Sequence, residues 1–251
     1  MGAPHPRGGS DSGRFAFLVM QEHPYGCEML EQLLSRGLSP DLIVEEESGV
    51  AAEERSKFLD RIAGHRLAPS IASQAARAGV EIATVPAHTD EHCLELLEAS
   101  SPRLLVLGGT RILRDRMLSS PPDGVLNSHP GLLPECRGSA SPAWSVYHDI
   151  PVGSSCHLCT PGIDEGDLVG RREVPVRRGD RYEDICYRTL VMAGTLMGEA
   201  LEAWTNGRLE EIRSPQGESP HPTFRNMPDE LLAVVHRKLR EETYRHYVGS
   251  S

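Results

Sequence analysis

The 251-residue sequence has neither a long hydrophobic run nor an excess of basic residues. No apolar stretch approaches the roughly 18–20 residues that a membrane-spanning helix requires, so we expect no membrane partner. The 26 lysines and arginines are outnumbered by 36 aspartates and glutamates, and the net charge is −10. Nonspecific binding to a phosphate backbone needs a basic surface, so we do not expect a nucleic-acid partner, although a local basic patch stays open.

An export signal and a complete cysteine metal site are also missing. The segment from Met1 to Arg14 lacks the apolar core of a signal peptide, so we predict a disordered leader over residues 1–12 of a cytoplasmic protein. The six cysteines are then reduced thiols. Cys156 and Cys159 have the spacing of half a zinc site, but residues three apart in a strand point to opposite faces and no second CxxC exists. We predict no metal site.

A glycine-rich phosphate loop is the third absence. Residues 14–20 form a continuous apolar run, which is typical of a buried parallel strand. The segment that follows, Gln21–Gly26, contains a single glycine, whereas a dinucleotide-binding domain has GxGxxG at this point. The sequence therefore disfavours NAD as a cofactor.

The remaining pattern predicts an α/β protein with a doubly wound, mostly parallel sheet. Strand-like runs cover 14–20, 40–45, 80–85, 103–107, 124–126 and 168–176. Helical spacing covers 27–38, 50–62, 71–78, 90–99 and 180–205. We assign residues 13–206 to one large domain. Residues 207–251 form a C-terminal extension, with a proline-rich loop and an amphipathic helix over 228–247, and this extension is a candidate homodimer contact.

The chemistry-bearing residues gather between Val125 and Asp167. Asn127 and His129 are two apart, so in an extended chain both side chains leave the same face. Pro130 follows and favours extended geometry at His129. An amide and an imidazole are thus predicted side by side at the carboxyl end of a strand, where ligands bind in open α/β sheets. Asp164 follows a Pro161-Gly162 turn, just after another strand.

Several motifs in this region occur in a familiar order. They are NSHPGLLP from Asn127, the Arg137-Gly138 pair, Pro142-Ala-Trp144, His157 and Ile163-Asp-Glu-Gly166. Together they resemble the Rossmann-like formyltransferase family that uses 10-formyltetrahydrofolate, most firmly between Pro102 and Leu168. The resemblance implies that Asn127, His129 and Asp164 are the catalytic trio. The chain departs from the family at Cys136, where an aromatic residue is commoner, and at Ser155, where threonine is usual.

The resemblance also implies where the formyl donor binds. In the family, the segment that corresponds to Gly108–Leu113 borders the folate pocket, and its main chain bonds the pterin. The turn at Asp164 closes over the same ring. The implied folate-binding residues are Gly109, Thr110, Arg111, Leu113, Pro161, Gly162 and Asp164. The donor is 10-formyltetrahydrofolate, and no metal is required.

Formyl transfer passes through a tetrahedral oxyanion when an amine attacks the formyl carbon. The amide of Asn127 has an N–H donor suited to that oxygen. His129 can donate to the same oxygen or act as base toward the amine, and the sequence leaves both roles open. Asp164 is placed to orient the imidazole. We interpret His157 as a packed or supporting residue, Ser139 and Ser141 as loop formers, and Trp144 as a core residue that could also wall a pocket.

The acceptor amine is expected near the loops that follow the first three strands. These loops contain Tyr25, Glu47 and His88, which are the predicted acceptor-binding residues. The acidic run Glu45–Glu47 also fits a solvated turn, and His88 and His92 also fit a solvent-exposed surface. If these loops are ordinary surface, the C-terminal extension holds the amine instead.

Among amines, an amino-sugar nucleotide or another small specialised amine is the best match. Methionyl-tRNA formyltransferases have an additional C-terminal β-domain for which this chain has little room, and glycinamide ribonucleotide enzymes carry a glycine-rich phosphate loop. Two alternatives stay open. One is a hydrolase that releases formate from the same donor, and the other is a folate-binding scaffold that has lost catalysis.

Overall fold

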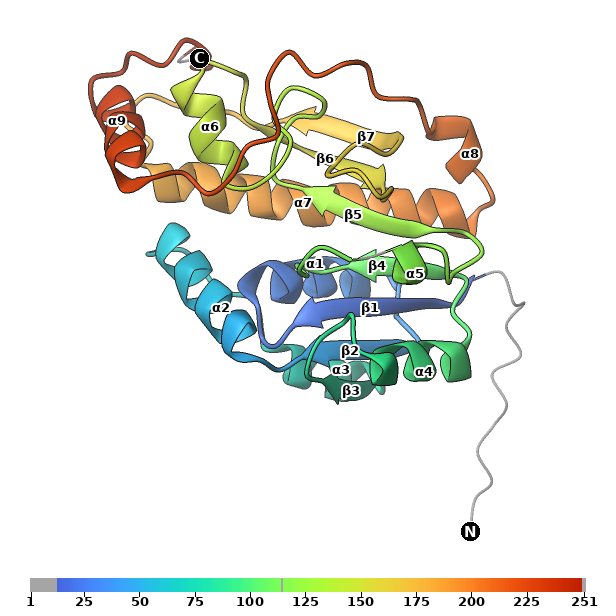
Figure 1. The fold of residues 1–251 in the computed structure, drawn as a ribbon. Helices are drawn as coiled ribbons and strands as arrows, with labels where there is room; N and C mark the ends of the chain where they lie inside the picture. The colour runs from blue at the N-terminus through green and yellow to red at the C-terminus, as the bar shows by residue number, and fades with distance from the viewer. Residues whose placement is uncertain (1–12, 114, 250–251) are drawn as a thin grey trace.

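The computed structural model describes residues 13–113 and 115–249, and the predicted leader over residues 1–12 lies outside the described residues. A seven-stranded sheet runs through the molecule in the order β3-β2-β1-β4-β5-β6-β7 (Figure 1). The strands are β1 (Phe15–Met20), β2 (Leu42–Glu46), β3 (Glu81–Val85), β4 (Leu104–Leu107), β5 (Val125–His129), β6 (Gly153–Leu158) and β7 (Leu168–Glu173). The first five strands are parallel, and β6 and β7 are antiparallel to their neighbours. The predicted doubly wound, mostly parallel sheet is confirmed.

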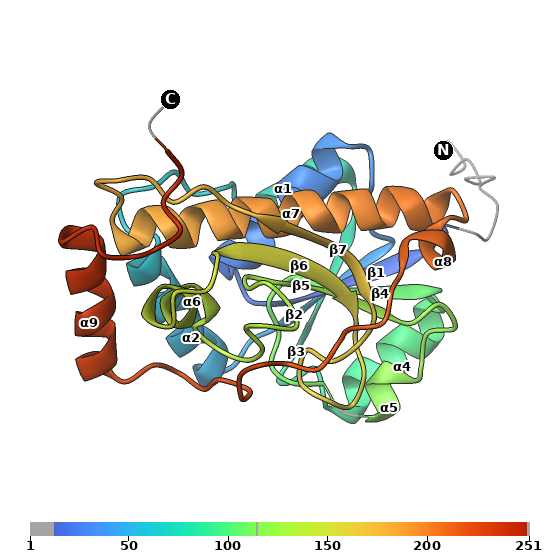
Figure 2. The same cartoon turned by 90° about the horizontal axis from the view of Figure 1, so that it is seen from above.

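Helices cover both faces of the sheet, which explains why its central strands are apolar throughout. Along β1, Phe17 and Val19 point into one hydrophobic cluster, and Leu18 points into the other. The first cluster lies under α1 (Pro24–Ser35), α3 (Ile71–Ala78) and the long α7 (Tyr182–Thr205). The second lies under α4 (Glu91–Ser100) and the short α5 (Asp115–Leu118). Figure 2 shows α1 and α7 on one side of the sheet and α4 and α5 on the other.

Local signals fix where the helices begin. The Asp90 side chain accepts from His92 N and caps α4, as its sequence predicts. His23 caps α1 by accepting from Tyr25 N, with Pro24 in the first turn. The helix α2 (Gly49–Arg61) begins after Ser48, whose hydroxyl accepts from Ala51 N. Each cap satisfies a backbone N–H group that has no partner inside its own helix.

The strand β5 is longer than predicted and includes the catalytic candidates. It was expected over 124–126 but runs from Val125 to His129, because β6 pairs with it as far as His129 and Ser155. Asn127 and His129 are therefore fixed by a backbone ladder and do not lie in a loop. This rigid placement matters for catalysis, because side chains on strands are held more firmly than side chains on loops.

The C-terminal extension packs into the first hydrophobic cluster and runs along the molecule from α8 (Leu209–Ile212) to α9 (Asp229–Arg240) (Figure 2). Between these helices, Phe224 pairs with the loop after β5, where its N donates to Arg137 O and its O accepts from Ser139 N. The last helix was expected as far as residue 247 but ends at Arg240, since Glu242 has a φ of 54° and cannot continue it. Short α6 (Ser141–Tyr147) packs against α9 and α7.

Candidate active site

The predicted trio meets at the carboxyl end of β5. Asn127 and His129 leave the same face of this strand, and Asp164 reaches them from the β6–β7 turn. Asp164 Oδ2 lies 3.5 Å from His129 Nδ1. A fourth side chain joins them, because His157 on β6 is the direct cross-strand partner of Asn127. His157 Nε2 lies 3.3 Å from Asn127 Nδ2 and 3.4 Å from Asp164 Oδ1.

The two nitrogens of His129 have different partners. Nε2 lies 2.7 Å from Cys136 O and 2.9 Å from Ser141 Oγ. Because a carbonyl oxygen only accepts, the proton of the neutral imidazole is on Nε2. Nδ1, which faces Asp164, then carries the lone pair. Any proton that His129 gains or loses during a reaction is therefore exchanged at Nδ1, beside the carboxylate.

Asp164 is held as a carboxylate. Burial alone would raise its pKa, but the positive charge that His129 and His157 carry when protonated, a hydrogen bond with His157 and the Gly138 N–H, which donates to Oδ2 at 2.8 Å, lower that pKa well below its usual range. The backbone of Asp164 has a φ of 54°, a value that non-glycine residues rarely adopt. A permanently ionised group in a strained turn is typical of a functional site.

A cavity of about 750 Å³ opens beside these four side chains. One wall is the segment Gly109–Leu113, and another is Cys159–Asp164. The carboxyl end of β1 contributes Met20, His23 and Tyr25. The remaining walls come from Phe58 of α2 and from Thr223–Asn226 of the extension. This volume is within the usual range for small-molecule sites, about 300–1,000 Å³.

The structure brings all the predicted folate-binding residues to this cavity. Gly109, Thr110, Arg111, Leu113, Pro161, Gly162 and Asp164 line it. Gly109 has a φ of 91°, and a side chain there would lie 3.2 Å from His23 Nδ1. The glycine therefore lets the main chain of this segment approach both His23 and the cavity closely.

The predicted acceptor-binding residues are not brought together. Tyr25 lines the cavity, but its hydroxyl donates to Ser128 O at 2.5 Å. Glu47 is exposed and lies away from the cavity. The interpretation of His88 as a surface residue is wrong, because only 1% of it is exposed. The interpretation of Glu45 and Glu46 as a solvated turn is also wrong, since both are buried at the end of β2.

Glu46 and His88 form a buried polar cluster instead. Glu46 accepts from His88 N at 3.1 Å and from Ser48 Oγ at 2.9 Å, and it pairs with Arg111 Nε at 2.8 Å. His88 Nε2 donates to Val44 O at 3.1 Å. Burial alone would raise the pKa of Glu46, but its contacts with His88, Ser48 and Arg111 lower that pKa to about 2. Through the ion pair between Glu46 and Arg111, the cluster holds the segment that contains Arg111.

Sequence reasoning missed four contributors to the site. Ser141 contacts the reactive imidazole, and the serine-rich RGSASP stretch was the only signal. His23 and Phe58, whose ring centroids lie 4.9 Å apart, wall the cavity on the side of β1. Phe224 arrives from the extension and stacks on Trp144 with centroids 4.8 Å apart, so Trp144 supports the cavity wall through Phe224.

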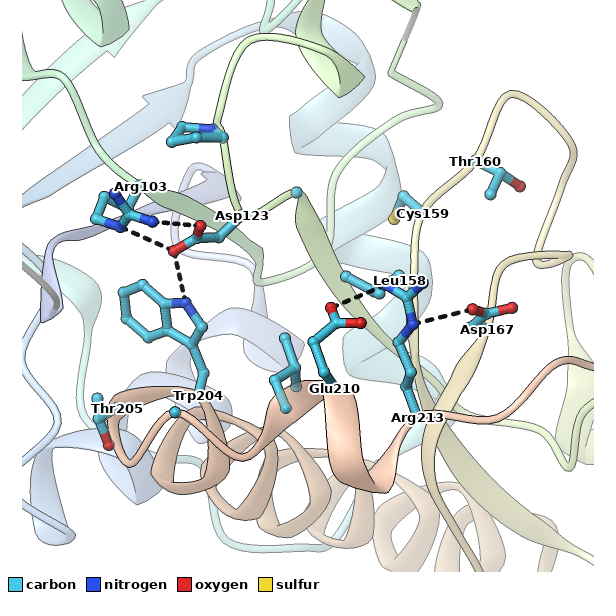
Figure 3. Close-up of a pocket in the computed structure, with 14 residues that line it drawn as sticks. Arg103, Asp123, Leu158, Cys159, Thr160, Asp167, Trp204, Thr205, Glu210 and Arg213 are labelled. Carbon is cyan, nitrogen blue, oxygen red and sulfur yellow. Dashed lines mark hydrogen bonds and ion pairs between the residues drawn. The ribbon is translucent and has the colours of Figure 1, made fainter.

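A second hollow lies at the opposite end of β4 and β5, away from the trio. Figure 3 shows its charged side chains bound to one another: Asp123 with Arg103 and Trp204, and Arg213 with Asp167 and Glu210. The charged groups of these side chains are thus paired with partners within the hollow. The cavity at the trio is therefore the candidate active site.

Known proteins identify the family. The sequence model described as formyl transferase matches residues 14–201, so the chain belongs to the formyl transferase family. The methionyl-tRNA formyltransferase of Geotalea uraniireducens is 24% identical over 204 residues, which is 80% of this chain and 62% of the relative. That of Trichlorobacter lovleyi is 27% identical over 143 residues, or 56% of this chain and 45% of the relative. The chain spans about half the length of the curated relatives that it matches.

Solved structures share the fold. Glycinamide ribonucleotide transformylase 1 from Symbiobacterium toebii has a TM-score of 0.62 at 25% identity, over 82% of this chain and 93% of that one. The N-formyltransferase from Helicobacter canadensis, in complex with folinic acid and dTDP-3-aminofucose, has a TM-score of 0.58 at 14% identity, over 86% and 71%. The predicted family and fold are confirmed, whereas these relatives differ in acceptor.

Proposed function

We propose that this protein transfers the formyl group of 10-formyltetrahydrofolate to a primary amine. The observation that carries the proposal is the convergence of Asn127, His129 and Asp164 on one wall of a cavity that the implied folate-binding segments line. The cavity has room for a small molecule, and the glycine backbone at Gly109 allows the close main-chain approach that a flat ring needs. When bound, the folate supplies the activated formyl group.

The geometry of the site gives each of the three side chains a different role in the proposed reaction. One N–H group of Asn127 is directed at His157, and the other can donate to the oxygen that becomes negative during the attack. Nδ1 of His129 accepts the proton of the amine, since Nε2 is already protonated against Cys136 O. The ionised Asp164 stabilises the imidazolium that results. Among the two roles that the sequence left open for His129, this arrangement favours the base.

We further propose that the acceptor is a small amine with an anionic group, such as an amino-sugar nucleotide. Arg55 and Arg61 on α2 lie close enough to His23 to lower its pKa, and Arg225 lines the cavity from the extension. Arg111 also lines the cavity, and these guanidinium groups at or near it favour an anionic ligand in a protein whose net charge is −10. The same net charge disfavours a large nucleic-acid acceptor.

The test is a panel of amines incubated with the protein and 10-formyltetrahydrofolate, followed by tetrahydrofolate release and product mass. The proposal predicts an N-formylated product with at least one anionic amine, formed at a rate lower by about 100-fold or more with the Asn127→Ala variant. Formate release that no amine accelerates would favour the hydrolase. Tight binding of folinic acid with neither product would favour a folate-binding scaffold and would contradict the proposal.

A further inference from the structure

One side chain of the C-terminal extension, Gln216, holds the turn that carries Asp164. Its Nε2 atom donates to Asp164 O at 2.9 Å and to Gly166 O at 2.6 Å. Its Oε1 atom accepts from Arg137 Nη2 at 3.1 Å. Because carbonyl oxygens only accept and a guanidinium only donates, these three partners fix the orientation of the Gln216 amide.

The Gln216 amide links the two segments that set the position of the Asp164 carboxylate. The first segment is the turn that contains Asp164. The backbone of Asp164 has a φ of 54°, a strained value that the surrounding contacts must stabilise. The second segment is the loop that contains Arg137 and Gly138. The backbone N–H of Gly138 donates to Asp164 Oδ2 at 2.8 Å. Arg137 also lies 3.6 Å from Glu165, the next residue in the turn. A shift of the turn relative to this loop would move Oδ2 away from His129.

We propose that Gln216 is a positioning residue for the reaction. It holds the main chain of Asp164 so that the carboxylate faces Nδ1 of His129, and it therefore makes the extension part of the active site. This inference rests on the proposed function, in which His129 and Asp164 manage the proton of the amine. Glutamate at this position would keep the acceptor for Arg137 but would have no N–H groups for the two carbonyl oxygens.

The kinetic test uses Gln216→Met, which removes all three hydrogen bonds at similar volume, and Gln216→Glu, which keeps only the Arg137 contact. Both should lower kcat by about 10- to 100-fold, because small displacements of a reacting group cost rate steeply. The KM for 10-formyltetrahydrofolate should change less than kcat does, because Gln216 contacts the Asp164 turn and Arg137 and leaves the Gly109–Leu113 wall in place. Glu218→Gln, an exposed neighbour on the same loop, is the matched control and should keep the wild-type kcat.

A second readout needs no activity. Hydrogen exchange of the Gly138 amide reports its bond to Asp164, and exchange of the Ser139 amide reports its bond to Phe224 O at 3.0 Å, which docks the extension. In both Gln216 variants the Gly138 amide should exchange about tenfold faster or more, while the Ser139 amide keeps its rate. Asp164→Asn calibrates the change expected when the carboxylate is lost.

The possible results distinguish the positioning role of Gln216 from the proposed formyl transfer. Unchanged Gly138 exchange together with unchanged kcat overturns the positioning role. Faster exchange at both amides also overturns it, because Gln216 would then only dock the extension. If the wild-type protein transfers no formyl group to any amine, but Gly138 alone responds, the positioning role stands and the proposed function fails.

Discussion

At the scale of single residues, the two N–H groups of Asn127 have different surroundings. One is directed at His157 Nε2, 3.3 Å away, and the other is left for the reacting oxygen. We expect Asn127→Ala to fold and to lower kcat by about 100-fold or more, the usual cost of removing such a donor. Single-turnover kinetics with saturating donor measure it, and Asn206→Ala, at the exposed end of α7, is the control. A variant that kept near wild-type turnover would remove Asn127 from the mechanism.

His23 is a second residue whose environment has a measurable effect, in this case on how stability depends on pH. Burial, and then the positive charges of Arg61 and Arg55, lower its pKa to about 4. The folded protein therefore keeps His23 neutral, while the unfolded chain binds a proton below about pH 6.5. Since the unfolded state then binds more protons, this group makes the folded state lose stability as pH falls from 6.5 toward 4.

His23→Asn isolates that effect, because the asparagine oxygen can still cap α1 at Tyr25 N. Between pH 8 and pH 5, the wild-type protein should lose about 2 kcal/mol more of its unfolding free energy than the variant. Urea denaturation at the two pH values measures the difference. Equal losses in both proteins would mean that His23 takes up its proton as readily in the folded state as in the unfolded one.

At the scale of secondary-structure elements, the end of β2 is tied to the proposed folate-binding segment through Glu46 and Arg111. Glu46 has its pKa lowered to about 2, so its stabilisation is complete above about pH 4.5 and is lost as pH falls from there toward 2. We expect Glu46→Gln to destabilise the protein by about 2 kcal/mol at pH 7, because buried donors lose a charged partner.

The exposed neighbour Glu47 provides a matched control for this prediction. Glu47→Gln should leave the unfolding free energy within about 0.5 kcal/mol of the wild-type value. Thermal and urea denaturation of both variants make the comparison. If Glu47→Gln instead raised the KM of the amine without a change in stability, the original prediction of Glu47 as an acceptor-binding residue would regain support.

Elements with a strong periodic pattern could be predicted from the sequence. The strands β1 and β4 are buried on both faces, so their residues form continuous apolar runs. The helix α7 buries one side, so its apolar residues recur with helical spacing. The meeting of Asn127, His129 and Asp164 could be predicted because their motifs occur in one ordered stretch of the chain, and their catalytic role stays a prediction. Gln216 and Phe224 could not, since their partners lie far away in the chain and a glutamine in a polar loop has no local signature. His88 was misplaced because its carboxylate partner, Glu46, comes from another strand.

At the scale of the whole molecule, the part of the chain that the structure describes contains no helix long and apolar enough to span a membrane. The sheet, the trio and the extension enclose one cavity, so a ligand in it should stabilise the fold as a unit. We expect folinic acid to raise the melting temperature, by the equivalent of about 2.7 kcal/mol at a concentration 100-fold above its Kd. NAD, NADP and ATP at the same concentration should cause no shift. A shift with a dinucleotide and none with folinic acid would contradict the folate assignment.

The predicted homodimer through the extension stays a prediction at this scale. The extension contributes Val235, Leu239 and Tyr244 to the core of its own chain. These side chains are therefore already used within one molecule. Light scattering after size-exclusion chromatography, on the wild-type protein and on a variant with changes on the exposed face of α9, measures whether the remaining surface joins two copies.

The contact between Gln216 and Asp164 also sets an order of events during synthesis. A ribosome adds about 5–20 residues per second, so β5 and the Asp164 turn leave it seconds before residue 216 follows. Until then the turn lacks the two hydrogen bonds from Gln216 and is held by its contacts with Gly138, His129 and His157. A chain that ended between Trp204 and Gln216 would lack these two hydrogen bonds to the turn. On our proposal, both the full hydrophobic core, which includes Val235 and Leu239, and catalytic competence are complete only once the extension has been made.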